Sequence, residues 1–268
     1  MLRFLLTLVL VSSAAFAEDW VYPLDVAVGK DGEMYIADRK LPGVLKLQGG
    51  ELSVVFKADK KFRTPLNAVR CVHVTADGTL LAGDSSTREV YAIRDGKPEP
   101  LTKGNIGIPT QITSQGDTVY VTDLELARVW KFPLAGGEPQ EVAVVSGPRG
   151  VAVDSTGAIW VLSPQKPQLR KLAEDGTETV IHEGLTFEFP QEVEVAADGT
   201  AYISDGYAKT IWKIPPGGEP AKWAVSEQFS NPVGMCWEGE NLLLIDSRAP
   251  GLFRMTPAGE VSRVYPAP

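Results

Sequence analysis

The chain has few of the residues that disulfide scaffolds and metal centres need. Its 268 residues include only two cysteines and two histidines, which excludes a disulfide-stapled fold and any site built from three histidines. Basic residues are outnumbered 26 to 34 by acidic ones, a formal net charge of −8, so the overall charge gives no indication of nucleic-acid binding. Glycine (26) and proline (20) are plentiful, which favours many turns and short strands over long helices.

One strongly apolar stretch stands at the beginning of the chain. Residues 1–17 combine a basic start at Arg3, an apolar run from Phe4 to Val11 and the small-residue ending Ala15-Phe16-Ala17. This layout is typical of a secretory signal peptide cleaved before Glu18, and the run is shorter than the roughly 20 residues that span a bilayer. We therefore expect an exported protein, periplasmic or extracellular, with no membrane insertion. Residues 18–268 should form a single domain, which we expect to be a monomer.

A repeat of 39 to 44 residues runs through the rest of the chain. Six similar phrases each begin with a proline: Pro23, Pro65, Pro109, Pro148, Pro190 and Pro232. Each phrase is followed by a turn and a second apolar run, which ends on Asp38, Asp84, Asp123, Ser163, Asp205 or Asp246. Six residues later, in all six copies, a third run begins, as in VLKL, VWKF and IWKI.

These runs predict an all-β fold. Each is short, rich in Val, Ile, Tyr and Trp, and bounded by glycine or proline, which is typical of strands. A four-stranded sheet cannot bury both faces alone, but six such sheets packed in a ring can. The sequence therefore predicts a six-bladed β-propeller with four antiparallel strands per blade, and the six prolines should open the innermost strands. The run VSRVY should complete the sixth blade, leaving residues 20–22 as at most a short cover.

The Pro-x-x-Val phrases, the second strands that end on Asp and the apolar-Lys-apolar third strands resemble NHL-type six-bladed propellers over residues 23–265. The chain is also broadly similar to gluconolactonase and regucalcin-like propellers. That likeness implies one divalent cation held at the channel mouth by Glu, Asn and Asp. The Glu-Gly-Pro, Asn-Gly and Asp-Gly phrases typical of those enzymes are missing at the matching positions. The repeat thus indicates architecture more than activity.

The two faces of the predicted ring differ in their loops. Tight turns join strands one and two and strands three and four of each blade, and they form what we call the hairpin face. The opposite, long-loop face carries the loops between strands two and three and the longer blade-to-blade connections 56–64, 101–108 and 183–189. Because longer loops on a rigid scaffold usually carry function, we expect the site on the long-loop face.

Acidic residues end five of the six second strands and could suggest a metal site. An Asp at a strand end, followed by a fixed loop, more often accepts backbone N–H bonds from that loop. We therefore interpret these five residues as structural caps.

Polar residues stand two positions after four of the prolines, and they are our ligand-binding candidates: Asp25, Asn67, Gln111 and Glu192, together with Arg149 beside Gly150. All should lie near the channel mouth on the long-loop face, where converging polar groups favour a binding site. The alternative is that they solvate a water-filled funnel.

Asp25 and Glu192 are also the candidate metal ligands, because an oxygen-rich set suits a calcium-like ion. Arg149 in the same ring would instead disfavour a cation and attract a carboxylate. His73, on the inner strand of the second repeat, is a further ligand-binding candidate, although a lone channel or core histidine is the commoner case.

Two functions remain open. The first is a binding propeller that holds a protein, a peptide or a small polar ligand at its long-loop face. The alternative is a lactonase-like hydrolase or lyase with a divalent cation at the channel mouth. His73 and His182 should lie on an inner and an outer strand, so no Ser-His-Asp relay is supported and no catalytic residue is identified. We favour binding, with no nucleic-acid partner. Cys71 and Cys236 should stay unpaired, because they lie in the second and sixth blades and the first blade stands between these two.

Overall fold

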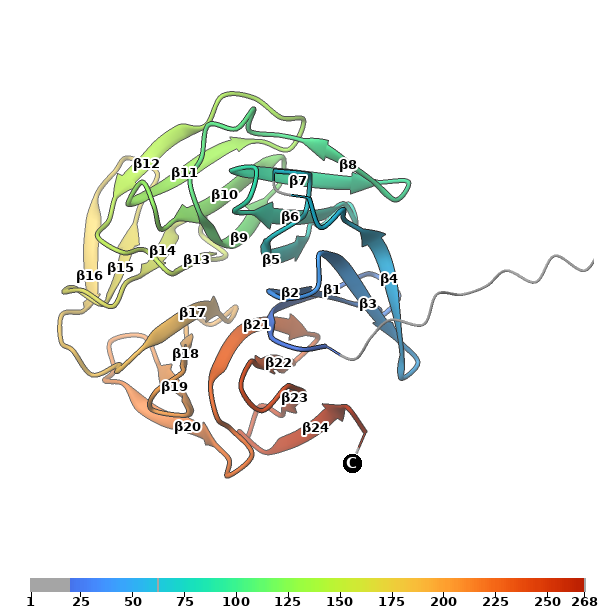
Figure 1. Cartoon of the computed structure of the whole chain (residues 1–268). Coiled ribbons are helices and arrows are strands. Elements are labelled where there is room, and N and C mark those ends of the chain that lie inside the picture. Colours follow the sequence, from blue (N-terminus) through green and yellow to red (C-terminus); the bar gives the residue numbers. More distant parts are fainter. Residues whose placement is uncertain (1–19, 62, 268) are drawn as a thin grey trace, which may run out of the picture.

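Six four-stranded sheets are arranged in a ring in the computed structural model, which describes residues 20–61 and 63–267 (Figure 1). Each sheet is antiparallel and its strands follow chain order from the channel outward. The predicted all-β, six-bladed propeller is confirmed. The expected signal peptide, residues 1–17, lies outside the described residues. Within those residues there is no helix with the length and apolarity needed to cross a membrane.

The first three blades comprise β1 (Pro23–Val28), β2 (Met34–Asp38), β3 (Gly43–Gln48) and β4 (Glu51–Lys57); β5 (Val69–Val74), β6 (Leu80–Asp84), β7 (Glu89–Arg94) and β8 (Lys97–Pro100); and β9 (Pro109–Gln115), β10 (Thr118–Asp123), β11 (Arg128–Pro133) and β12 (Gln140–Val144). The other three comprise β13 (Gly150–Val153), β14 (Ile159–Leu162), β15 (Leu169–Leu172) and β16 (Glu178–His182); β17 (Pro190–Val195), β18 (Ala201–Asp205), β19 (Thr210–Ile214) and β20 (Ala221–Val225); and β21 (Pro232–Glu238), β22 (Asn241–Asp246), β23 (Gly251–Met255) and β24 (Val261–Tyr265).

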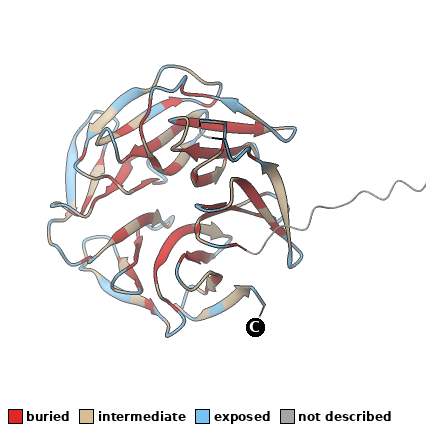
Figure 2. Ribbon diagram, in the orientation of Figure 1, coloured by how far each residue is buried: buried red, intermediate tan, exposed pale blue. Residues whose placement is uncertain are grey.

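The core lies between neighbouring blades. Burial is concentrated in the inner three strands of each sheet, and the outermost strands are partly exposed (Figure 2). One apolar cluster, for example, joins Leu81 of the second blade to Phe132 of the third. Burying such a side chain stabilises the fold by roughly 1.5–3 kcal/mol, so each blade depends on its neighbours.

The ring closes without exchange of a strand. β21–β24 form the sixth blade from its own segment, and β1 packs against both β21 and β5. Trp20 lies edge-to-face on Tyr265 with ring centroids 4.7 Å apart, which makes residues 20–22 a short cover, as predicted. Cys71 on β5 and Cys236 on β21 are both free thiols, which confirms the prediction that they do not pair.

The second and fourth blades depart from the prediction that a proline opens every inner strand. β1, β9, β17 and β21 do begin at a proline, but β5 begins at Val69, which pairs with Asp84 as Pro23 pairs with Asp38. Pro65 lies four residues earlier, in a turn where the fully buried Leu66 has a φ of 58°. Pro148 stands two residues before β13. Because the second phrase is longer, the residue of the second blade that matches Asp25 is Cys71 and not Asn67.

Candidate functional site at the channel mouth

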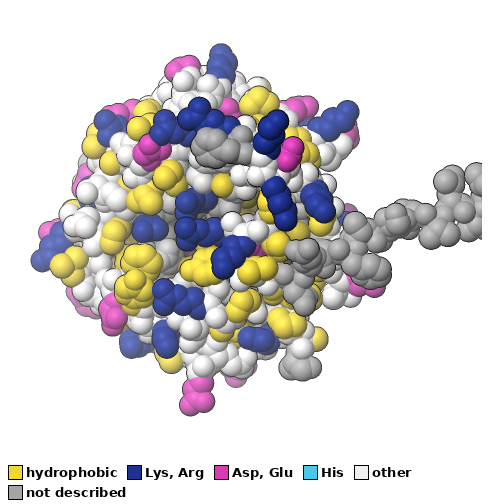
Figure 3. Space-filling view, viewed as in Figure 1, with side chains coloured by type: hydrophobic (Ala, Val, Ile, Leu, Met, Phe, Trp, Pro, Cys, Tyr) yellow, Lys and Arg dark blue, Asp and Glu magenta, His cyan; other side chains and the backbone are white. Residues whose placement is uncertain are grey.

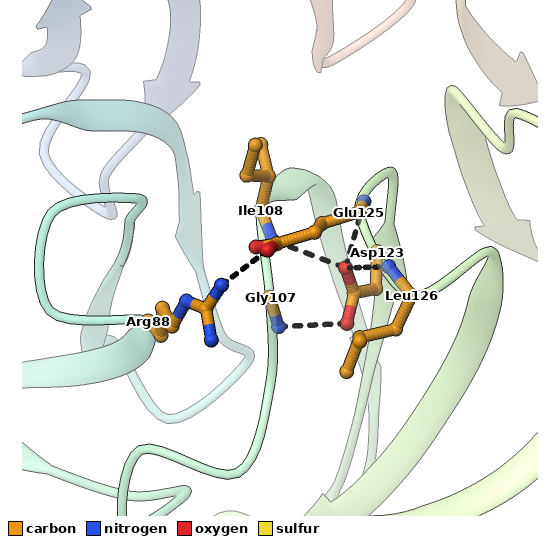
Figure 4. Close-up of polar contacts among 6 residues, drawn as sticks. All are labelled: Arg88, Gly107, Ile108, Asp123, Glu125 and Leu126. Carbon is orange, nitrogen blue, oxygen red and sulfur yellow. Dashed lines mark hydrogen bonds and ion pairs between the residues drawn. The ribbon is translucent and has the colours of Figure 1, made fainter.

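The Asp residues that end the second strands are structural caps, as predicted. Asp123 accepts backbone N–H bonds from Gly107 and Ile108 in the preceding connection and from Glu125 and Leu126 in its own loop (Figure 4). Figure 4 also shows Glu125 paired with Arg88 of the neighbouring blade. Asp38, Asp84, Asp205 and Asp246 make the same kind of set. These carboxylates fix the long loops, and their oxygens are used for that purpose.

A polar plug closes the middle of the channel. Asp25, Gln111 and Glu192 come from the first, third and fifth blades, and each accepts a backbone N–H from the next blade. The donors are Val72 to Asp25 at 2.8 Å, Val151 to Gln111 at 2.7 Å and Met235 to Glu192 at 2.7 Å. The amide of Gln111 also donates to the carbonyl of Val193 at 3.4 Å. All three side chains are buried, so the plug joins the blades together.

Small residues on the alternate blades make room for this plug. The positions that match Asp25 on the second, fourth and sixth blades are Cys71, Gly150 and Gly234. A methyl group at Gly234 would lie 2.5 Å from the Cα of Asp25, closer than any real contact. The alternation of small and polar residues is therefore a packing requirement.

Asp25 and Glu192 hydrogen-bond to each other through their side chains. Burial raises the pKa of Asp25 to about 8, although two backbone N–H bonds oppose the rise. Burial and the Asp25 charge raise the pKa of Glu192 well above its ordinary value. The two carboxyl groups therefore hold at least one proton between them at neutral pH, because ionising both in a buried site is costly.

The plug separates two funnels. The mouth, on the long-loop face, is a small pocket of about 70 Å³ lined by Leu24, Arg70, Thr110, Arg149, Gln191, Glu192, Val233 and Gly234. The hairpin funnel, of about 200 Å³, is lined by the other ends of the inner strands and includes His73, Glu194 and Cys236.

Two guanidinium groups line the mouth. Arg70 and Arg149 are half-buried, and neither takes part in any of the ion pairs found among the described residues. Burial lowers the pKa of both, and the charge of Arg70 lowers that of Arg149 further. Arg70 Nε donates to Ser85 Oγ at 3.1 Å, whereas Arg149 Nε is buried with no hydrogen-bond partner in the described structure. An unsatisfied buried donor costs about 1–3 kcal/mol.

An aromatic wall stands beside Arg149. Its guanidinium lies 5.1 Å from the ring centre of Phe189, and Phe189 stacks on Tyr207 with centroids 4.5 Å apart. Tyr207 is 54% exposed. The mouth thus combines cationic donors with a flat apolar surface.

Charge is segregated between the two faces. The face turned toward the viewer in Figure 3 has Lys and Arg side chains gathered around its central hollow. Among the described residues, the segments that follow even-numbered strands form the long-loop face and carry eleven basic residues against five acidic ones. The basic ones are Arg39, Lys40, Lys60, Lys61, Arg63, Arg88, Lys103, Arg149, Lys166, Lys209 and Arg248, and the acidic ones are Asp59, Glu125, Glu183, Glu188 and Glu227.

The described hairpin turns, which follow odd-numbered strands, carry thirteen acidic residues and one basic residue, Lys30. The acidic residues are Asp31, Glu33, Asp77, Asp95, Asp117, Glu138, Asp154, Glu174, Asp175, Asp198, Glu219, Glu240 and Glu260. An acidic chain therefore does offer a basic face here, because the negative net charge is the sum of two faces of opposite sign.

The sequence-predicted site residues separate into three places. Arg149 is at the mouth, as expected. Asp25, Gln111 and Glu192 form the plug below it, and His73 faces the hairpin funnel on the other side. Asn67 lies outside the channel set, in the turn before β5, where its amide donates to the carbonyl of Asp59 at 2.6 Å. Its expected place at the mouth was wrong, because the longer second phrase moves the strand start.

The residues at these positions do not fit a divalent cation. The oxygens of Asp25 and Glu192 accept backbone N–H bonds and bond to each other, and two guanidinium groups line the mouth above them. In the described part of the chain, no group of three His, Cys, Asp or Glu side chains is placed to hold a metal ion.

Sequence reasoning missed three elements of the site. Arg70 was overlooked because the proline pattern misplaced the start of β5, although Val69 stands fifteen residues before Asp84, as Pro23 does before Asp38. Phe189, one residue before β17, could have been recognised from its place in a long connection. Glu194 gave no signal, because a second acid in an alternating strand is typical of a solvent-facing position.

The comparisons with known proteins agree with this architecture. Residues 19–184 match the family described as the SMP-30/Gluconolactonase/LRE-like region. A virginiamycin B lyase of Nocardia farcinica is 24% identical over 200 residues, covering 74% of this chain and 69% of the lyase.

Solved structures show the same fold at lower identity. A gluconolactonase of Xanthomonas campestris superposes with a TM-score of 0.74 at 15% identity, covering 92% of this chain and 87% of the other. A chain of a nidogen/laminin complex gives 0.73 at 14% identity, covering 87% and 93%. From its family match over residues 19–184, this chain belongs to the SMP-30/gluconolactonase/LRE-like family.

Proposed function

We propose that this protein is a binding propeller that holds the carboxylate of a small organic acid or peptide at its mouth. The observation that carries the proposal is the pair of half-buried guanidinium groups, Arg70 and Arg149, with Arg149 Nε buried and unpartnered in the described structure. A carboxylate there accepts charge-assisted hydrogen bonds in the forked geometry that guanidinium favours.

The surroundings of the mouth support the same ligand class. The pocket of about 70 Å³ accommodates one carboxylate rather than a whole molecule, so the rest of the ligand lies on the rim. Phe189 and Tyr207 offer that remainder a flat surface. The excess of basic residues on the long-loop face draws anions toward the channel, an effect that weakens as salt rises.

Calorimetric titration with benzoate tests the proposal, because this probe has both a carboxylate and a ring. We expect the Arg149→Gln variant to bind at least tenfold more weakly. Lys97→Gln, which removes one positive charge from an exposed position on β8, should change the affinity less than twofold. Equal binding by the parent and Arg149→Gln, or no binding by the parent at millimolar benzoate, rejects the proposal.

The family match supports a second candidate, a lactonase-like hydrolase or a lyase, because gluconolactonase and virginiamycin B lyase are among the related proteins. The guanidinium pair at the mouth argues against it, since a divalent cation is disfavoured there. Hydrolysis of glucono-1,5-lactone, measured with and without added calcium, magnesium or zinc, separates the two candidates. Metal-dependent turnover that survives in Arg149→Gln favours the hydrolase and opposes the binding proposal.

We also propose that the protein acts outside the cytoplasm. The support is the arrangement of Arg3, the apolar run and Ala15-Phe16-Ala17 in residues 1–17. Mass spectrometry of the protein produced with its natural N-terminus should find Glu18 as the first residue. An intact Met1 in the cytoplasmic fraction contradicts export.

A further inference from the structure

The hairpin funnel has features of a second site, which does not depend on the proposed function at the mouth. It opens on the acidic face, and its volume of about 200 Å³ is well above the ~30 Å³ share of one water molecule. The inner walls include Val28, Val74 and Ile112, which are apolar. Polar side chains also line the funnel, among them His73, Thr113 and Glu194.

Glu194 is the polar group in the funnel whose carboxyl lacks a partner. Its carboxyl lines the funnel and makes no hydrogen bond or ion pair with any described residue. Burial, with a further contribution from the charge of Asp25, raises its pKa to about 8. No Lys or Arg among the described residues lines the funnel to balance it. Such a carboxyl stays protonated until a cation pairs with it or the pH rises past its pKa, and a bound cation favours its ionised form.

The neighbours of Glu194 do not supply that cation. His73 Nε2 lies 2.8 Å from Ser114 Oγ, and burial lowers the pKa of His73 to about 4, so the imidazole is neutral. Burial and the nearby carboxyls raise the pKa of the Cys236 thiol. The Asp25–Glu192 pair behind them consists of two carboxyl groups, which cannot supply a positive charge. Among residues 20–61 and 63–267, no positively charged side chain that lines the funnel is available to pair with ionised Glu194, so an added ligand would have to supply the cation.

The surface around the funnel favours cations. Its described hairpin turns carry thirteen acidic residues against one basic residue, and such a field raises the local concentration of positive ligands. Trp237 also lines the funnel, and an aromatic ring attracts organic cations through its face.

We propose that the hairpin funnel binds a small organic cation, an alkylammonium group whose charge pairs with Glu194 and whose carbon chain lies on the apolar walls. A bare metal ion fits less well, because no group of three His, Cys, Asp or Glu in the described chain is placed to ligate one. The two faces then bind ligands of opposite charge, with the plug between them.

The test is a titration of the protein with n-butylammonium chloride at pH 8.5, followed by the NMR signals of the tryptophan indole N–H groups. Sodium chloride keeps the ionic strength constant. The variant Glu194→Gln keeps the shape but removes the charge, and should bind at least tenfold more weakly. The matched control, Glu219→Gln, removes an exposed carboxyl from the same blade and should bind within twofold of the parent.

Two further readouts distinguish a cation paired with Glu194 from an apolar ligand and from a metal ion. Since the cation requires ionised Glu194, the parent should bind more than tenfold more weakly at pH 6 than at pH 8.5, and Glu194→Gln should show no such dependence. Binding of neutral n-butanol as tight as that of n-butylammonium overturns the proposal in favour of an apolar cavity. Calcium or zinc that competes stoichiometrically in the parent and not in Glu194→Gln overturns it in favour of a metal site.

Discussion

The plug makes the protein's stability depend on pH in a direction opposite to ordinary surface carboxylates. Asp25 and Glu192 hold at least one proton between them at neutral pH in the folded state, whereas both lose theirs near pH 4 in the unfolded chain. Their folded pKa values are raised, so the stabilisation is complete below about pH 4 and is lost as pH rises toward about 8. One proton of difference changes the free energy of unfolding by about 1.4 kcal/mol per pH unit.

Glu192→Gln is the informative change, because glutamine can keep the hydrogen bonds to Met235 and Asp25 but cannot bind or release the proton of the carboxyl group. The glutamine oxygen can accept the N–H of Met235, and its amide can donate to ionised Asp25. Between pH 6.5 and 8 the parent should lose about 2 kcal/mol more of its free energy of unfolding than the variant. Unfolded histidine titrates near pH 6.5 and cysteine near pH 8.5, but these groups are the same in parent and variant, so their effect cancels in the difference. Glu194 also has a raised pKa, and its share of the slope should remain in the variant.

Urea denaturation at pH 6.5, 7, 7.5 and 8 measures this difference. Glu219→Gln is the control and should follow the parent at every pH. A free energy of unfolding that stays constant or increases in the parent over this range would contradict the raised pKa values of the pair. A slope in Glu192→Gln equal to that of the parent would contradict them equally.

Other consequences concern the caps and the packing of the plug. Asp123→Ala should lower the free energy of unfolding in urea by about 3–5 kcal/mol, because four backbone N–H groups and the indole of Trp130 lose their acceptor. Ser163→Ala should lower it by only about 1 kcal/mol. Equal losses in the two variants would contradict the role of Asp123 as a cap. Gly234→Ala should lower the melting temperature by several degrees because its methyl group would meet Asp25 at 2.5 Å, while Gly137→Ala, with its nearest neighbour at 3.4 Å, should change it little. Thiol titration of the denatured, unreduced protein should find two free groups, and finding none would contradict the separation of Cys71 from Cys236.

The architecture could be predicted from sequence because it is repeated six times. A strand-ending Asp followed at a constant distance by another apolar run requires the same loop in every blade, and the caps on Asp38, Asp123 and Asp205 explain why. The prediction failed where one copy differs. Four additional residues in the second blade moved the strand start from Pro65 to Val69, so Asn67 took the place of Cys71 in the predicted set and Arg70 was missed.

The chemistry was harder to predict because it depends on which blades face each other. Asp25 and Glu192 are 167 positions apart in sequence, and nothing local indicates that one carboxyl bonds to the other. The net charge of −8 also gave no indication of the basic face, because it is a sum over two faces of opposite sign. Charge counted separately for turns that follow odd and even strands would have found the basic face.

A crystal structure of the protein with 4-bromobenzoate would show where a carboxylate ligand binds, because anomalous scattering from bromine locates the ligand. We expect a carboxylate hydrogen-bonded to Arg149 at the mouth, with its ring against Phe189 or Tyr207. A ligand found elsewhere while the mouth holds a divalent cation would contradict this expectation.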